Sequence, residues 1–233
     1  MDTETDDEVT TAVKPNHLFV LPFLEPYYRD EHCTIFNADC RKVLPFLDRF
    51  DLLLTDPPYG ISWGTPEGPT RKPSKQVIGD DRPFEPAFVM ESADRRILWG
   101  GNYYTSKLPV TNAWLVWDKR VTDWTNDQSD CEFAWTDLDT PARVFRKNWG
   151  GGGCAQKENG AGAGYLHATQ KPVALMSWCL GLVPDARTII DPFMGSGTTL
   201  VAAKREGRQA VGIEISEEYC EIAAERLRQG VLF

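Results

Sequence analysis

The chain has 233 residues, 42% of them hydrophobic, which is enough to bury one substantial core, so we expect a single main domain. Its formal net charge of −9 argues against a protein that simply coats nucleic acid. No run of about 18 apolar residues is available to span a membrane, and the acidic start lacks the pattern of a signal peptide. The six cysteines form no Cys-x-x-Cys pair, which argues against structural zinc. We therefore expect a cytoplasmic protein with reduced thiols, no metal and no membrane contact.

Residues 1–28 are predicted to be a flexible acidic tail followed by a lead-in rich in proline and aromatic residues. Beyond them, short apolar runs predict strands at 33–37, 50–55, 96–99 and 113–117. Short helices are predicted between these strands, at 41–47 and 86–92. The interval 61–84 has no periodicity and predicts a functional loop. A strand, a helix and a strand in fewer than about thirty residues form the unit of a parallel sheet.

The second half of the chain continues this alternation. The runs 132–135 and 142–145 predict an antiparallel pair of strands at one edge of the sheet. The glycine-rich stretch 149–164 predicts a mobile flap. Further strands are predicted at 188–191 and 209–214, and further helices at 171–181, 197–206 and 216–229. Pro172 suits the first turn of a helix and Ser216 suits an N-cap. The alternation predicts an α/β fold with a mostly parallel sheet.

The segment Asp56-Pro57-Pro58-Tyr59-Gly60 directly follows the buried strand at 50–55. Because proline cannot donate to a strand ladder, the strand must end at Asp56, at the sheet edge where open α/β sheets bind ligands. A carboxylate, a fixed backbone carbonyl and an aromatic ring together suit a planar base that carries an exocyclic amino group. The alternative is a structural Pro-Pro turn with an incidental Asp and Tyr.

The segment Asp191-Pro192-Phe193-Met194-Gly195-Ser196-Gly197-Thr198-Thr199 joins a predicted strand to a predicted helix. Its glycines allow a tight turn and a close approach to a ligand, and the helix start offers N–H groups. It is neither a Walker loop nor a complete dinucleotide fingerprint, so a purely structural turn is the alternative. Glu214 ends the next strand, about 20 residues beyond Asp191, where nucleotide-binding sheets place an acid that accepts from ribose hydroxyls.

These two motifs, together with Thr169-Gln170-Lys171-Pro172, resemble the DNA amino-methyltransferases that use S-adenosylmethionine. The catalytic motif precedes the cofactor motif, as in the β group of that family, a circular permutation of the usual order. The resemblance covers about residues 30–230 and implies a Rossmann-like, mostly parallel sheet with helices on both faces. It divides the domain 29–233 into a catalytic half (about 29–120), a variable target-recognition region (about 120–166) and a cofactor half (about 167–233).

The resemblance also implies the reaction and its residues. Asp56 and the Pro57 carbonyl would accept the two N–H groups of a flipped-out base, and Pro58 and Tyr59 would complete the base site by rigidity and stacking. Glu214 would accept from the ribose, Asp39 would lie near the adenine or ribose, and Lys171 near the methionine carboxylate. The full set expected at S-adenosylmethionine is Asp39, Thr169, Lys171, Asp191, Phe193, Gly195, Ser196, Gly197, Thr198 and Glu214.

Clusters of cations are the expected contacts with the phosphates of double-stranded DNA, with a solvated surface as the alternative. They are Arg71, Lys72, Lys75, Lys119, Arg120, Arg143, Arg146 and Lys147. Asp at position 56 resembles the adenine-N6 members more than the cytosine-N4 members, which stay the alternative. The short interval available for target recognition favours a solitary or phage-type methylase over half of a large restriction-modification system. Monomer and homodimer stay open.

Two rival hypotheses come from other classes. One is methylation of RNA or of a protein side-chain amide, because a carboxamide resembles an exocyclic amino group. Protein-directed relatives tend to carry Asn in place of Asp56, which counts against that version. The other is a nucleic-acid-binding module without turnover, against which the intact Asp56, Tyr59 and Glu214 count. Binding of S-adenosylmethionine distinguishes the enzymes from the module.

Overall fold

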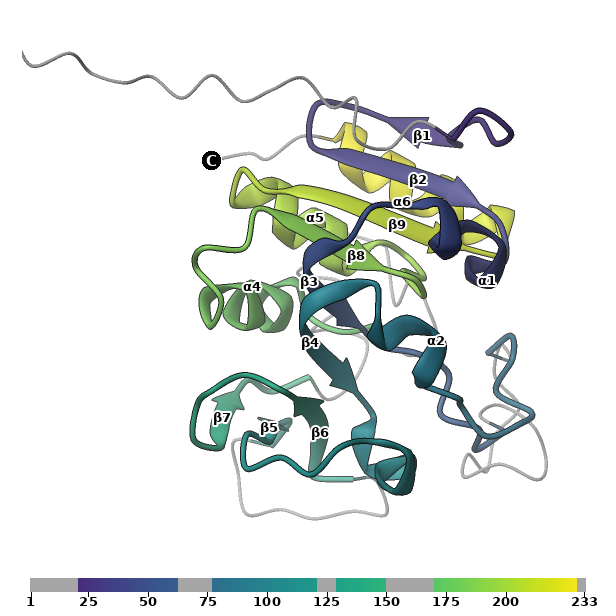
Figure 1. Ribbon diagram of the computed structural model, residues 1–233. Coiled ribbons are helices and arrows are strands. Elements are labelled where there is room, and N and C mark those ends of the chain that lie inside the picture. Colours follow the sequence, from purple (N-terminus) through teal and green to yellow (C-terminus); the bar gives the residue numbers. More distant parts are fainter. Residues whose placement is uncertain (1–20, 63–76, 121–128, 150–169, 230–233) are drawn as a thin grey trace, which may run out of the picture.

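The computed structural model describes residues 21–62, 77–120, 129–149 and 170–229 (Figure 1). The expected acidic tail, most of the expected loop at 61–84 and nearly all of the expected glycine-rich flap lie outside the described residues. None of the helices in the described ranges combines the length and the apolar character needed to cross a membrane.

The strands of the described chain form one nine-stranded sheet with the order β1-β2-β9-β8-β3-β4-β6-β5-β7. Their bounds are β1 (Tyr28–Arg29), β2 (Cys33–Asn37), β3 (Phe50–Thr55), β4 (Ala93–Trp99), β5 (Leu115–Asp118), β6 (Cys131–Thr136), β7 (Arg143–Arg146), β8 (Thr188–Asp191) and β9 (Gln209–Glu214). The five strands β2, β9, β8, β3 and β4 run parallel to one another. The expected α/β fold with a mostly parallel central sheet is therefore confirmed, and the carboxyl ends of these five strands meet at one edge.

The α-helices are α1 (Cys40–Val43), α2 (Ala87–Met90), α4 (Val173–Gly181), α5 (Thr198–Arg205) and α6 (Glu217–Arg228). Short 3-10 helices are η2 (Leu44–Phe46), η3 (Gly101–Tyr103) and η4 (Thr105–Lys107). The expected helix at 41–47 is split into α1 and η2, with Pro45 inside the second piece. Ser216 stands at the N-cap of α6 as expected, but its side chain makes no capping hydrogen bond.

Two expectations need correction. The runs 132–135 and 142–145 do not pair with each other, because β5 lies between β6 and β7. Strand β6 has both edges occupied, by β4 and β5 in antiparallel pairing, so β7 adds in parallel to the outer edge of β5. The helix expected from position 171 begins at Val173, because Pro172 is its extended N-cap with ψ at 141°. Lys171 therefore precedes the helix, as the restriction on a residue before proline favours.

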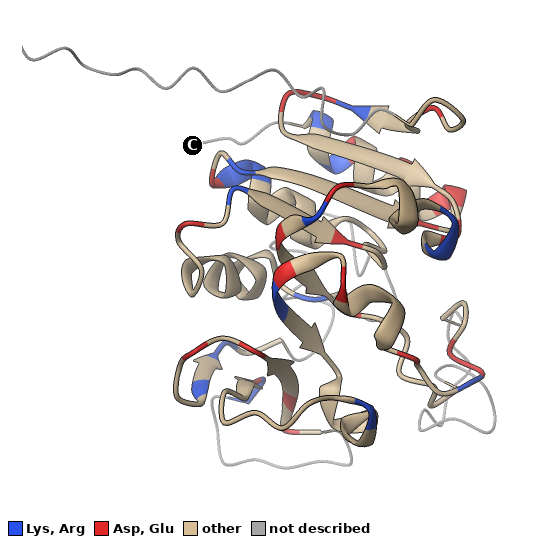
Figure 2. Ribbon diagram, viewed as in Figure 1, with Lys and Arg blue, Asp and Glu red and all other residues tan. Residues whose placement is uncertain are grey.

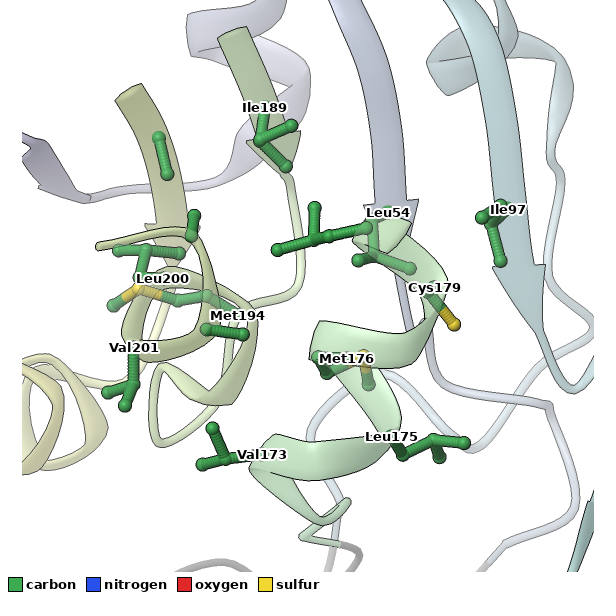
Figure 3. Packing of buried hydrophobic residues seen from close by; sticks show 14 of the residues in the cluster. Leu54, Ile97, Val173, Leu175, Met176, Cys179, Ile189, Met194, Leu200 and Val201 are labelled. Carbon is green, nitrogen blue, oxygen red and sulfur yellow. The ribbon is translucent and has the colours of Figure 1, made fainter. Parts of the chain in front are cut away.

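The core has two layers, one on each face of the sheet. Leu52 and Leu54 face the cluster that contains α4, α5 and α6, whereas Leu53 faces the cluster that contains α1 and α2. This follows from the alternation of side chains along a strand, and Figure 1 shows the helices on the two sides of the sheet. Figure 3 shows Met176 and Cys179 of α4 beside Leu54 and Ile97 of the central strands. Each fully buried aliphatic side chain contributes roughly 1.5–3 kcal/mol to folding.

Asp51 fixes strand β3 against the start of β8. Its Oδ2 accepts hydrogen bonds from the backbone N–H groups of Arg187 (2.7 Å) and Thr188 (2.8 Å). The Thr188 hydroxyl in turn accepts from the Asp51 N–H at 3.0 Å. Burial alone would raise the pKa of Asp51, but these donors outweigh it and lower the pKa. The contacts align β3 and β8, whose far ends carry Asp56 and Asp191.

Replacing Asp51 by Ala is expected to cost about 1–3 kcal/mol at pH 7, because two backbone donors lose a charged acceptor. Because the pKa of Asp51 is lowered in the folded state, its contacts stabilise the fold at neutral pH, and this stability is lost as the pH falls through the folded-state pKa. The difference in unfolding free energy between Asp51→Ala and wild type should therefore shrink toward acid pH. Urea unfolding at pH 7 and at pH 3 measures both effects. Asp185→Ala, which removes an exposed pair with Arg95, serves as the control and should change stability little. Equal losses for the two variants would contradict this role of Asp51.

Candidate active site

Strands β3 and β8 bring the partly buried Asp56 and the buried Asp191 to the same sheet edge. The Thr55 hydroxyl at the end of β3 donates to Asp191 Oδ1 at the end of β8, over 2.7 Å. The Phe193 N–H donates to the same oxygen at 3.2 Å. Burial raises the pKa of Asp191 to about 6, although these donors oppose the shift. Asp191 is therefore held by the chain itself at the start of the glycine turn.

Asp56 lies in a dense network just beyond β3. Its Oδ1 accepts from the Tyr59 hydroxyl and its Oδ2 accepts from Lys171 Nζ, each at 2.5 Å. Lys171 Nζ also donates to the Tyr59 oxygen at 3.2 Å. Burial raises the pKa of Asp56. The Lys171 ammonium opposes this shift, and a second carboxylate, that of Glu132, adds to it. Burial alone would lower the pKa of Lys171, but Asp56 and Glu132 raise it, so the ammonium keeps its charge.

Glu132 of β6 completes this network and was not expected from the sequence. Its Oε1 accepts from Lys119 Nζ at 3.0 Å, and its Oε2 lies 3.1 Å from Lys171 Nζ. Burial would raise the pKa of Glu132, but the two ammonium groups outweigh burial and lower it. A signal did exist in the sequence, because strand alternation places Glu132 on the same face as the buried Ala134. An acid on the buried face of a strand needs a partner.

The Tyr59 ring is held by residues that the sequence motifs did not point to. Tyr103 of η3 stacks on it with ring centroids 4.9 Å apart and an interplanar angle of 15°. Gly100 has φ of +72°, and a Cβ at this position would lie 1.9 Å from a Tyr59 ring carbon. Asp80 holds Gly60, the residue after Tyr59, by accepting from the Gly60 N–H at 2.6 Å. These contacts set the orientation of Tyr59 beside Asp56.

The glycine turn after β8 is braced from two sides. Gly195 and Gly197 both have positive φ, at 50° and 78°. Glu214 Oε2 accepts from the Gly195 N–H at 3.1 Å, and its Oε1 accepts from the Ser216 N–H at 2.8 Å. Burial raises the pKa of Glu214 against the effect of these donors. Arg226 of α6, not expected from the sequence, donates to the Ser196 carbonyl at 2.7 Å.

A cavity of about 40 Å³ joins the two motifs. Its lining includes Asp56 and Lys171 on one side and the glycine turn on the other. The full lining is Asp56, Gln170, Lys171, Met176, Asp191, Phe193, Met194, Gly195, Ser196, Thr198 and Thr199. Six of the residues expected at the cofactor therefore share one cavity with Asp56 of the catalytic motif.

Other expected residues lie elsewhere. Glu214 is outside the cavity lining, behind Gly195. Asp39 caps α1 by accepting from the Arg41 N–H at 3.0 Å, and it lies at the same sheet edge because Asn37 pairs with Glu214. Gly197 packs against α6, where a Cβ would come 2.7 Å from Ala223 Cβ. Thr169 lies outside the described residues.

The cations expected to contact DNA differ in their ion pairs and in their exposure. Lys119 pairs with Glu132, and Arg120 pairs with Asp130 at 2.7 Å. Arg143 and Arg146 of β7 are exposed, and Lys147 is partly exposed. Basic and acidic residues are interspersed along the ribbon in Figure 2. Arg71, Lys72 and Lys75 lie outside the described residues.

Replacing Gly100 by Ala is expected to destabilise the fold, because the new Cβ would overlap the Tyr59 ring. Gly207→Ala is a matched control, since Gly207 has a similar φ of +66° but open space around its Cβ position. Both variants should lose about 1–2 kcal/mol to the left-handed backbone. Gly100→Ala should lose about 1–3 kcal/mol more through overpacking. Chemical unfolding of both variants measures the difference, and equal losses would show that Tyr59 moves aside without cost.

Known proteins resemble this chain in sequence. A profile of the DNA methylase family, which covers N6 and N4 enzymes, matches residues 83–225, more than half of the chain. The type II methyltransferase M2.LlaDCHI of Lactococcus lactis subsp. cremoris is 41% identical over 86 residues, 36% of this chain and 31% of that protein. The orphan methyltransferase M.BamHII of Bacillus amyloliquefaciens is 52% identical over 58 residues, 25% of this chain and 20% of that protein. The matched segments thus span less than a third of these curated relatives.

Solved structures show the same fold. The PvuII DNA methyltransferase (cytosine-N4-specific) superposes with a TM-score of 0.60 at 14% identity, over 87% of this chain and 89% of its own. The M1.HpyAVI–SAM complex superposes with a TM-score of 0.52 at 20% identity, over 83% of this chain and 99% of its own. The expected methyltransferase fold is confirmed by this likeness. With the profile match over 83–225, the chain belongs to the DNA methylase family.

Proposed function

We propose that this chain transfers a methyl group from S-adenosylmethionine to the exocyclic N6 of an adenine in double-stranded DNA. The main observation behind the proposal is that Asp56 and the turn at Gly195 line the same cavity. On one wall, Asp56 presents an acceptor suited to an amino group. On the other wall, the glycine turn lies between the carboxylates of Asp191 and Glu214. Membership of the DNA methylase family supports methyl transfer to DNA.

The residues around the glycine turn fit S-adenosylmethionine by their chemistry. Asp191 is a buried and Glu214 a partly buried carboxylate at the ends of adjacent strands, and such acceptors suit hydroxyl and ammonium groups. Gly195 and Ser196 would lie under the methionine portion, with Asp39 toward the adenine and Phe193 on the cavity wall. When bound, the cofactor supplies a methyl group on a sulfonium, which is an electrophile. The cavity of about 40 Å³ must widen to admit it.

Asp56 and Tyr59 would handle the base. The amino group of adenine is poorly nucleophilic because its lone pair is delocalised into the ring. Hydrogen bonds from its two N–H groups to Asp56 and to the Pro57 carbonyl would favour the pyramidal nitrogen whose lone pair can attack. The nitrogen becomes positive as it reacts, and the raised pKa of Asp56 suits it to receive the proton that leaves.

A base inside a duplex cannot reach this cavity, so the proposal requires that the adenine be flipped out of the helix. Tyr59 would then offer its ring for stacking, a contact worth about 1–3 kcal/mol in other base–aromatic pairs. Tyr103 already lies against that ring at 4.9 Å, so it must either move or stay on the opposite face. Phosphate contacts would fall to the exposed Arg143 and Arg146 of β7.

The experiment that tests the proposal is transfer of labelled methyl from S-adenosylmethionine to unmethylated DNA, followed by mass spectrometry of the nucleosides. We expect N6-methyladenine, because position 56 carries Asp. N4-methylcytosine would keep the mechanism and change the base. Label absent from DNA but present in RNA or protein would overturn the proposed substrate.

Asp56→Asn is expected to lower methyl transfer by about 10²-fold or more, because the variant loses the charged acceptor and the proton acceptor. Binding of S-adenosylmethionine should stay within about twofold of wild type, since Asp56 is assigned to the base. Calorimetric titration with the cofactor and a single-turnover transfer assay measure the two effects. A large loss of cofactor affinity would show that Asp56 belongs to the other half of the site.

Glu214→Ala is expected to show the opposite pattern and weaken S-adenosylmethionine binding by about tenfold or more, because a buried acceptor and the brace of Gly195 are both lost. Glu217→Ala, an exposed acid in the first turn of α6, is the control and should bind the cofactor as wild type does. Calorimetry of both variants gives the comparison. Wild-type affinity in Glu214→Ala would remove this residue from the proposed cofactor site.

A further inference from the structure

Both carboxylate oxygens of Asp56 already accept a hydrogen bond in the arrangement described above. One carboxylate oxygen accepts from the Tyr59 hydroxyl and the other from Lys171 Nζ, both at 2.5 Å. An amino group that is to donate to Asp56 must therefore share an oxygen with one of these donors or displace it. Lys171 is the donor that also lines the cavity, which is too small for a nucleoside until its walls move. Movement of the Lys171 ammonium to another acceptor would leave one Asp56 oxygen to the amino group alone.

Glu132 offers such an acceptor. Its Oε2 lies 3.1 Å from Lys171 Nζ, close enough for an ion pair but without the geometry of a hydrogen bond. This oxygen is buried, and no hydrogen bond from the described part of the chain reaches it. The other oxygen, Oε1, is anchored by Lys119 at 3.0 Å, which keeps the carboxylate in position. A buried carboxylate oxygen with unused acceptor capacity is costly unless a donor reaches it.

Lys171 can exchange the two acceptors without leaving its surroundings. Its side chain is only 5% exposed, so bulk water cannot replace Asp56 as its partner. Lys171 precedes Pro172, the extended N-cap of α4, so it is not part of the helix. A change of side-chain rotamer that shortens the contact to Glu132 lengthens the contact to Asp56.

We infer that Glu132 is a positioning residue for the proposed methyl transfer, which accepts the Lys171 ammonium and so releases Asp56 for the amino group of the base. This inference rests on the proposed function. Without the charge of Glu132, Lys171 stays paired with Asp56 and the amino group competes with an ammonium for the carboxylate. The rate of transfer should therefore fall while the cofactor still binds.

The interaction itself is tested without any reaction, by a double-mutant cycle on unfolding with Glu132→Gln, Lys171→Met and the double variant. If the two side chains act as one unit, the double variant loses less stability than the two single losses added together. Additive losses would overturn the inference. They would leave methyl transfer by the wild-type chain, and with it the proposed function, untouched.

The role in transfer is tested on the full chain with labelled S-adenosylmethionine and unmethylated DNA in single-turnover assays. Glu132→Gln should lower the rate at saturation at least about tenfold while the Kd values for cofactor and DNA stay within about twofold. Glu132→Asp, which keeps the charge, should recover part of the rate. Asp137→Asn is a matched control, because its pair with Arg96 adjoins the same strand, and Asp137 is 27% exposed against 26% for Glu132.

The outcomes distinguish a failure of the role inferred for Glu132 from a failure of the proposed function. A wild-type rate in Glu132→Gln, or equal losses in Glu132→Gln and Asp137→Asn, would overturn the role of Glu132. A rate loss that Glu132→Asp does not relieve would also overturn it, because charge would not be the cause. Failure of the wild-type chain to methylate DNA would overturn the proposed function, whereas a coupled unfolding cycle would still support the Glu132–Lys171 pair.

Discussion

The buried ion pair between Lys171 and Asp56 is the contact on which the site depends, because it joins segments 115 residues apart in the sequence. Asp56 belongs to the end of β3, and Lys171 precedes the helix that leads to β8. The hydrogen bond from Thr55 to Asp191 and the bonds of Asp51 tie the same two regions together. The ion pair adds to these ties by fixing Asp56 beside Lys171 in the lining of the cavity.

The pair does not stand alone, and its surroundings explain how so many charges can be buried. Two carboxylates, Asp56 and Glu132, face two ammonium groups, Lys171 and Lys119, so the network is neutral in sum. Buried charges are tolerated when they are paired and hydrogen-bonded, and removing one partner is strongly destabilising. This balance gives Lys119 a structural task inside an acidic protein, although its position in the sequence suggested a contact with phosphate.

The central fold could be predicted from the sequence because its signals are local. The apolar run before Asp56 and the glycines after Asp191 mark strand ends without knowledge of the rest of the chain. The position of Glu132 could not be predicted, since it depends on β6 being inserted between β4 and β5. Asp80 holds Gly60 across a loop, and the direction of Lys171 depends on the backbone at Pro172. These features arise from pairings between distant segments, which short-range periodicity does not report.

Arg226 lies in the last turns of α6, outside the cavity, yet its guanidinium holds the Ser196 carbonyl inside the glycine turn. The close approach of Gly197 to Ala223 ties the same helix to the same turn. The terminal helix is therefore part of the scaffold that shapes the pocket. A fusion partner or a truncation that frays the end of α6 would change the shape of the pocket without touching any residue that lines it, so an engineered form of the chain should leave this helix intact.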